Sequence, residues 1–297
     1  LAQTFSVALY VMGFSESVIA LFPSLNIKVV GILTTLLLGS LAFFSTKATI
    51  KAQYVILSVI ALSIVSLIFG KPVENGELGL LEVTSPEKVG FWKVFAVFFP
   101  AVTGILAGVN MSGDLKDASR SIPLGTFLAV GTGYVIYMLL PVILWRRADP
   151  SLLISDPLIM RRIAYWGGAI VMGVWGASLS SATGSLLGAP RVLQALTRDN
   201  VVPRRFAVLA QSYGSENIPR GSTVLTVIIT LVCVVLGDLN TIAPVLTMFF
   251  LATYGILNFT AGIERFLKNP SFRPKFKVHW GFSLIGAIGC IVVMFLI

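Results

Sequence analysis

The chain has 297 residues, of which 56% are hydrophobic and only 12% are charged, and its mean hydropathy is +0.90. Soluble domains carry about 25% charged residues, so this composition excludes an ordinary soluble domain and indicates a polytopic membrane protein. The net charge of +9 is not gathered into a basic patch with interleaved aromatic residues, which argues against a nucleic-acid partner. Cys233 and Cys290 both lie in apolar stretches, and no haem, zinc or nucleotide motif occurs. We therefore expect no cofactor, no resident metal and no enzymatic chemistry.

Apolar stretches of about 20 residues recur along the chain and predict an all-α protein with about nine transmembrane helices. Each is long enough to cross the roughly 30 Å hydrocarbon core of a bilayer. The sixth is too long for one crossing, and we expect it to leave the membrane near Pro190 and to continue as a cytoplasmic helix. No soluble domain fits between the spans, so residues 1–297 are predicted to form one transmembrane domain. In chain order the spans cover about 2–22, 27–44, 50–70, 91–110, 123–145, 163–196, 222–237, 241–263 and 279–297.

The distribution of lysine and arginine predicts how the spans are oriented. Fourteen of the 22 basic residues lie in the alternate loops 45–52, 111–122, 191–221 and 264–278, and the other eight lie on the opposite side. Cytoplasmic loops carry the excess of lysine and arginine. The first set of loops is therefore predicted to be cytoplasmic, and Leu1 begins on that side.

The sequence FFPAVTGILAGVNMSGD, residues 98–114, predicts a break inside the fourth span. Pro100 removes one hydrogen bond of the helix, and glycine tolerates the dihedral angles of a broken helix. Non-helical backbone at membrane depth persists only where protein or a watery cavity surrounds it, and transporters use it to hold ions. We expect carbonyls around Pro100 and the Thr103 hydroxyl to face a cation, and amides near 104–106 to face an anion. The alternative is a proline kink packed against a neighbouring helix.

The run GASLSSATGS, residues 176–185, concentrates small and hydroxyl side chains in the middle of the sixth span. Such residues let helices approach closely and bond across to one another, so helix packing is one interpretation. A sodium site is the other, because a hard cation binds oxygen ligands. The Ala177 carbonyl and the hydroxyls of Ser180 and Ser181 lie within one helical turn and could share one ion.

Two tyrosines, Tyr10 and Tyr254, are predicted to lie at mid-span in otherwise apolar runs. Tyrosine normally favours the membrane interfaces, and a phenol this deep needs a partner for its hydroxyl. Taken singly, each is more often a packed tyrosine whose hydroxyl bonds to a neighbouring carbonyl. Glu16 is an intramembrane carboxylate in the first span, and the sequence assigns it no role.

These same residues resemble the cation–chloride cotransporters, a family of the amino acid–polyamine–organocation superfamily. FFPAVTGILAGVNMSGDLKDASRSIPLGT is similar to the sixth span and following loop of that family. ALYVMGFSES resembles its third span, SLSSATGSLLGAPRVLQALTRDNVVP its eighth and APVLTMFFLATYGILNF its tenth. The chain thus looks like the third to eleventh of twelve spans, and the resemblance implies the inverted-repeat transporter fold.

The resemblance also implies three kinds of ion site, each on residues that match the family's motifs. The implied potassium site is Tyr10, Pro100 and Thr103, and the implied sodium site is Ala177, Ser180 and Ser181. The implied chloride donors are the backbone amides of Gly104, Ile105 and Leu106 together with the hydroxyl of Tyr254.

The function implied by the resemblance is symport of sodium, potassium and chloride across a lipid bilayer by alternating access. The paired serines Ser180 and Ser181 favour the sodium-dependent branch of the family, whereas GAPR after them resembles the potassium–chloride branch. A homodimer is left open as the assembly. Two alternatives remain: an amino-acid permease, whose substrate carboxylate takes the place of chloride, and a non-transporting membrane subunit.

Leu1 opens directly into an apolar stretch without a basic n-region, so we expect no signal peptide. The last residues also stop inside an apolar run, which indicates an internal fragment of a longer protein. In the family that the chain resembles, the first span supplies the other half of each ion site. We expect this chain alone not to transport.

Overall fold

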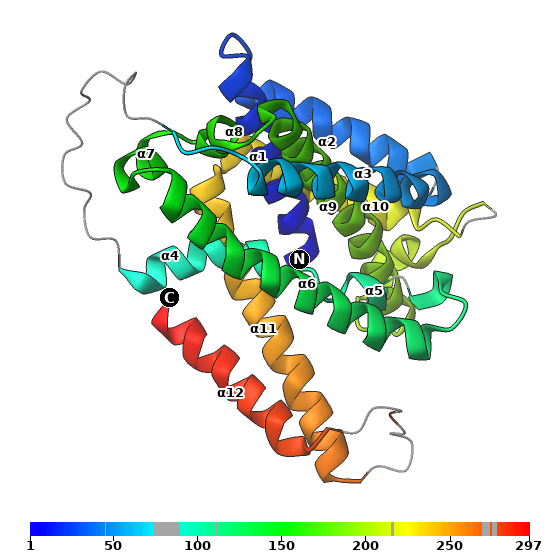
Figure 1. The fold of residues 1–297 in the computed structure, drawn as a ribbon. Coiled ribbons are helices and arrows are strands. Elements are labelled where there is room, and N and C mark those ends of the chain that lie inside the picture. Colours follow the sequence, from blue (N-terminus) through cyan, green and yellow to red (C-terminus); the bar gives the residue numbers. More distant parts are fainter. Residues whose placement is uncertain (45, 74–89, 111, 215–216, 269–273, 275–277) are drawn as a thin grey trace.

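A computed structural model describes residues 1–297 except 45, 74–89, 111, 215–216, 269–273 and 275–277. Its regular elements in the described residues are α-helices and short 3₁₀ helices, as the sequence predicts (Figure 1). In chain order they are α1 Ala2–Leu21, α2 Ile27–Phe44, α3 Thr46–Ile68, α4 Phe91–Phe98, η1 Phe99–Val102, α5 Ala107–Asn110, η2 Ser112–Asp114, α6 Ala118–Arg147, α7 Pro150–Ser155, α8 Ile159–Ile163, α9 Gly167–Arg198, η3 Arg204–Ala210, α10 Arg220–Leu236, α11 Leu239–Phe266 and α12 Trp280–Leu296.

The helices follow the predicted spans closely. Four of them, α1, α6, α9 and α11, are long and apolar enough to cross a membrane, and the other predicted spans fall on shorter apolar helices in the described residues. The number of crossings stays a prediction. As expected, α9 passes Pro190 without interruption and ends at Arg198. The predicted start of this span at 163 is wrong, because α8 ends there and α9 begins at Gly167.

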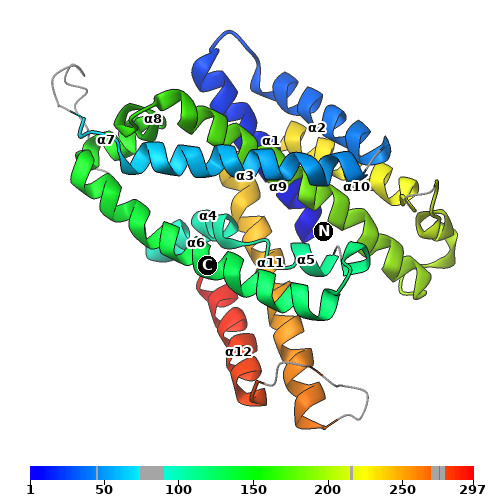
Figure 2. The same cartoon turned by 45° about the vertical axis from the view of Figure 1, so that its right-hand side comes forward.

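Helix α1 lies inside the molecule and contacts α9, α10, α11 and α2 (Figures 1 and 2). Val7 and Val11 of α1, Leu186 of α9 and Val234 of α10 are completely buried in one apolar cluster. A helix that is apolar on all sides is expected in such a buried position. Beside this core, α3 packs along α9, where Gly173 leaves room for a side chain of α3.

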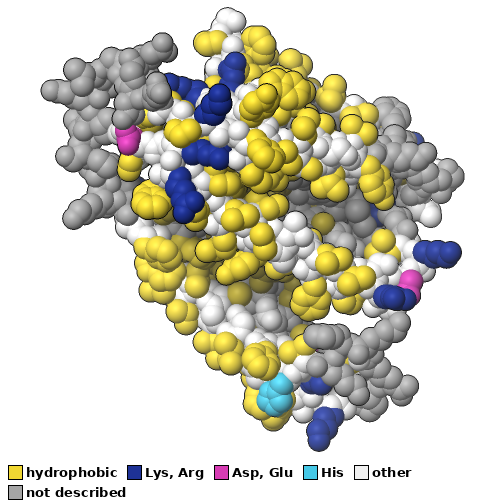
Figure 3. Space-filling model, in the orientation of Figure 1, with side chains coloured by type: hydrophobic (Ala, Val, Ile, Leu, Met, Phe, Trp, Pro, Cys, Tyr) yellow, Lys and Arg dark blue, Asp and Glu magenta, His cyan; other side chains and the backbone are white. Residues whose placement is uncertain are grey.

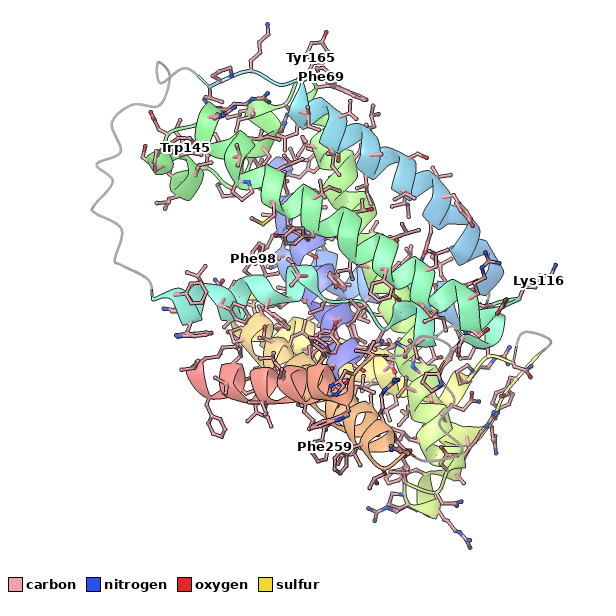
Figure 4. The ribbon with its side chains drawn as sticks, turned by 60° about the horizontal axis from the view of Figure 1, so that its bottom comes forward. Phe69, Phe98, Lys116, Trp145, Tyr165 and Phe259 are labelled. Atoms are coloured by element: carbon pink, nitrogen blue, oxygen red, sulfur yellow. The ribbon has the colours of Figure 1, made fainter. Side chains whose placement is uncertain are left out.

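The ends of several helices are joined at one end of the bundle. The guanidinium of Arg147, the last residue of α6, donates hydrogen bonds to the carbonyls of Leu67 and Ile68 at the end of α3, at 2.5 and 2.7 Å. Figure 4 shows Phe69, Trp145 and Tyr165 at this end and Lys116 at the opposite one. This grouping agrees with the predicted alternation of loops. Of the basic residues used for the orientation, Lys88, Arg273, Lys275 and Lys277 lie outside the described residues.

Large apolar side chains cover much of the outer surface (Figure 3). Leu33, Phe127 and Phe295 are 62%, 62% and 87% exposed, and lysine and arginine gather toward the ends of the bundle in the same view. Soluble monomers rarely expose apolar patches larger than a few hundred Å². The surface is that of a protein whose sides face lipid.

Candidate ion site at the break between α4 and α5

The helix that begins at Phe91 ends close to Pro100, where the sequence predicts the break. The α-helical part stops at Phe98, and a 3₁₀ turn continues to Val102. Thr103 is then extended, and Gly104 has a φ of 108°, which L-residues with a side chain rarely adopt. The following helix is shorter than expected. It starts only at Ala107 and has four residues, so 104–106 form a turn before it.

Three residues of the implied potassium site meet on the carbonyl side of the break. The Thr103 hydroxyl donates a hydrogen bond of 2.7 Å to the carbonyl of Pro100, and the Thr103 amide donates to the same oxygen at 3.2 Å. The hydroxyl of Tyr10, from the buried helix α1, faces Thr103. Hydroxyl and carbonyl oxygens from two distant segments are thus gathered at one point.

The implied chloride site involves the residues that follow Thr103, together with Tyr254 of α11, which lies close to Tyr10. In the described structure the amides of Gly104, Ile105 and Leu106 donate no main-chain hydrogen bond. The hydroxyl of Tyr254, from α11, is buried and has no hydrogen-bond partner there. The Gly104 amide points toward this hydroxyl, although the pair falls short of a full hydrogen bond. Free donors from two segments, the Gly104 amide and the Tyr254 hydroxyl, therefore lie next to each other, and unpaired donors of this kind suit an anion.

A cavity of about 600 Å³ opens beside Gly104 and Ile105, between the break and α6. Its walls include Thr103, Gly104 and Ile105 on one side and Gly133 and Tyr137 on the other. This volume lies within the range of about 300–1,000 Å³ that is typical of small-ligand pockets. The break therefore has access to a space that an ion or a small solute could enter.

The three residues of the implied sodium site lie on α9, as predicted. They are far from the break in the sequence. Ala177 and Ser180 are half-buried, whereas Ser181 is exposed. Ser180 lines a second cavity of about 340 Å³, together with Ile56 and Ile60 of α3. In the described residues no hydrogen bond joins these serines to the break.

Two residues that donate hydrogen bonds to the broken segment are not among the site residues predicted from the sequence. Thr247 of α11 donates to the carbonyl of Ala96, and Tyr137 of α6 donates to the carbonyl of Ala101. The sequence does indicate that Pro100 leaves the carbonyl four residues earlier without its usual donor. It does not indicate which neighbouring side chain fills that place.

Two acidic residues lie outside this site. Glu16 is an exposed residue of α1, and no catalytic or binding role follows from its position. Asp238 precedes α11 and accepts a hydrogen bond of 2.8 Å from the Thr241 amide. This bond lowers the pKa of the Asp238 carboxyl below its usual range. The carboxylate caps the start of the helix that carries Thr247 and Tyr254.

Comparison with known proteins places the chain in a family. The amino acid permease family model matches residues 1–297, the whole chain, so this protein belongs to the amino acid permease family. It is a multi-pass integral membrane protein.

Among individual proteins, the chain is similar to members of solute carrier family 12 over its full length. It is 32% identical to the mouse and 33% identical to the human protein called solute carrier family 12 member 2. It is 30% identical to human solute carrier family 12 member 1. The chain spans only 30%, 29% and 32% of these three proteins, respectively. The expected resemblance is confirmed, and the chain corresponds to about a third of each relative's length.

Proposed function

We propose that the full-length protein is a secondary active symporter that moves sodium, potassium and chloride together by alternating access. The proposal is supported by membership of the permease family and by the likeness to solute carrier family 12. No covalent chemistry is required. Ion gradients supply the driving force, and binding of the complete set of ions favours the rearrangement that exposes the site to the other face.

The observation that carries the proposal is the pairing of opposite kinds of ligand at one break. Oxygen atoms of Tyr10, Pro100 and Thr103 lie close together, and the unpaired Gly104 amide and Tyr254 hydroxyl lie next to them. In a site of low dielectric constant, a cation and an anion held side by side reduce the electrostatic cost of each other. This arrangement explains why potassium and chloride would bind and move together.

Sodium is assigned to the oxygen atoms of Ala177, Ser180 and Ser181 on α9. In the described structure the hydroxyls of Ser180 and Ser181 make no hydrogen bond to their own helix, unlike the nearby Thr183, whose hydroxyl donates to Leu179. The two serine hydroxyls are therefore available as ligands for a hard cation. Helix packing is the competing role, and α3 passes next to this part of α9.

A second candidate is an amino-acid permease. The family match and the cavity of about 600 Å³ favour it, because that volume admits a small organic substrate. The free amides of 104–106 would then hold the substrate carboxylate instead of chloride.

The two candidates differ in rubidium transport, since rubidium substitutes for potassium. We would measure rubidium-86 uptake into cells that express the full-length protein, with and without external sodium and chloride. The symporter predicts uptake that needs both ions. Uptake that needs chloride but not sodium assigns the protein to potassium–chloride symport. Absence of rubidium uptake together with uptake of a radiolabelled amino acid identifies the permease.

A further inference from the structure

The proline at the break leaves one carbonyl without its usual donor. In an α-helix the amide of each residue donates to the carbonyl four residues earlier. The residue four positions after Ala96 is Pro100, which has no N–H. Ala96 is 3% exposed, so water does not readily reach this carbonyl. A buried carbonyl without a donor is costly, and most such groups in proteins are paired.

Thr247 of α11 supplies the missing hydrogen bond. Its hydroxyl lies 2.6 Å from the carbonyl oxygen of Ala96, and its side chain is completely buried. Threonines in helices commonly donate to the carbonyl four residues earlier in their own helix. Thr253 and Thr260, also on α11, do so, with donor–acceptor distances of 2.7 and 2.9 Å. The Thr247 hydroxyl instead donates its hydrogen bond to a carbonyl of a different helix, α4.

A second carbonyl at the break, at an exposed position, also accepts a hydrogen bond from a side chain of a neighbouring helix. The carbonyl of Ala101 would accept from Gly104 or Ile105 if the helix continued, but neither amide donates a main-chain bond in the described structure. The hydroxyl of Tyr137 on α6 donates to this carbonyl at 2.7 Å instead. The Tyr137 ring also packs edge-on against Phe98, which lies at the end of α4 (Figure 4).

We propose that Thr247 and Tyr137 are positioning residues that hold the broken segment in its ion-binding form. Each donates a hydrogen bond to a carbonyl that the break would otherwise leave without a main-chain donor. The two residues lie on different neighbouring helices. Thr247 and Tyr254 lie seven residues apart on one face of α11. One rigid helix therefore contacts the segment before the proline and the amide after it. This links the cation side of the site to the chloride side, and it rests on the proposed symport.

The test replaces only the hydroxyl. Thr247→Val keeps the shape of the side chain and removes the donor, whereas Thr247→Ser keeps the donor. In the full-length protein we expect Thr247→Val to raise the KM for rubidium and the KM for chloride together, each by about tenfold, the effect of losing one buried hydrogen bond. Thr247→Ser should stay within about twofold of the unchanged protein. Tyr137→Phe should also raise both KM values.

Matched controls come from hydroxyls outside the site. Thr253→Val removes a hydroxyl of α11 that bonds only within its own helix, and Tyr165→Phe alters an exposed tyrosine between α8 and α9 that does not line the cavity. Both should leave the two KM values unchanged. If Thr247→Val changes only the maximum rate, in proportion to the amount of protein in the membrane, Thr247 has a merely structural role and the proposal is overturned.

A second readout does not depend on transport. Hydrogen–deuterium exchange of the purified full-length protein in nanodiscs reports on peptides that cover 98–107. Faster exchange of this segment in Thr247→Val, but not in Thr253→Val, supports the positioning role even if rubidium is not transported. Unchanged exchange in a protein that does transport rubidium overturns the positioning role and leaves the symport intact.

Discussion

Replacing Tyr254 with phenylalanine removes one oxygen atom, and the structure predicts opposite effects on chloride affinity and on stability. The hydroxyl is buried and has no hydrogen-bond partner in the described residues, and the Gly104 amide points toward it. In the ion-free protein, an unsatisfied buried polar group costs about 1–3 kcal/mol. With chloride bound, the same hydroxyl would donate to an anion.

The size of the effect follows from the strength of that hydrogen bond. Hydrogen bonds to charged groups contribute about 1.5–3 kcal/mol, and about 1.4 kcal/mol corresponds to a tenfold change in affinity. Tyr254→Phe is therefore expected to weaken chloride binding by about 10- to 150-fold. In the absence of chloride the same substitution should leave the thermal stability unchanged or raise it, because no bond is lost and a buried hydroxyl is removed.

The assay is the chloride dependence of rubidium-86 uptake by the full-length protein, paired with thermal unfolding in chloride-free gluconate buffer. Tyr165→Phe is the control, since Tyr165 is an exposed residue between α8 and α9 and does not line the cavity. An unchanged chloride KM in Tyr254→Phe would refute the role of this hydroxyl in anion binding. A fall in thermal stability without chloride would show that the hydroxyl already has a protein partner.

Three further predictions concern the backbone, the serines and the packing of α9. Gly104→Ala should weaken ion binding, measured by rubidium uptake, by roughly 5- to 150-fold, because a positive φ strains an L-residue by about 1–3 kcal/mol although its Cβ would meet open space. Gly108→Ala, whose Cβ also meets open space and whose φ is not positive, should leave rubidium uptake unchanged, and an equal loss in both variants would contradict the role of the backbone at Gly104. The double substitution Ser180→Ala/Ser181→Ala should remove the sodium dependence of rubidium uptake, whereas persistent sodium dependence would contradict the sodium site. Gly173→Val should lower the melting temperature, because even a Cβ there would overlap a side chain of α3, and an unchanged melting temperature would contradict that close packing.

Much of the fold could be predicted because hydropathy and helix signals are local. The predicted span 27–44 coincides with α2, and α1 and α12 agree with the prediction to within one or two residues. The break was also predictable, since Pro100 lacks an amide and Gly104 tolerates a positive φ. The length of the helix after the break could not be predicted, because residues 104–106 form a turn although they are as apolar as the helical residues that follow.

The candidate site could be predicted only in part. Tyr10, Thr103, Gly104 and Tyr254 were singled out from the sequence and a family resemblance, and the structure brings them together. Thr247 was missed because its importance depends on which helix lies beside α4, and hydropathy along one chain carries no information about neighbours. The orphaned carbonyl could be inferred from the proline, but its partner required the tertiary structure.

Joint binding of cation and chloride at one break requires that the two kinds of ion also move together. Chloride-36 accumulation in proteoliposomes of the purified full-length protein, driven by inward gradients of potassium and sodium, measures this coupling. We expect chloride to accumulate above its equilibrium level only when both cations are supplied, and Tyr254→Phe to reduce this accumulation at low chloride. Chloride entry that is indifferent to the cation gradients, or no chloride entry at all, would contradict joint binding at the break.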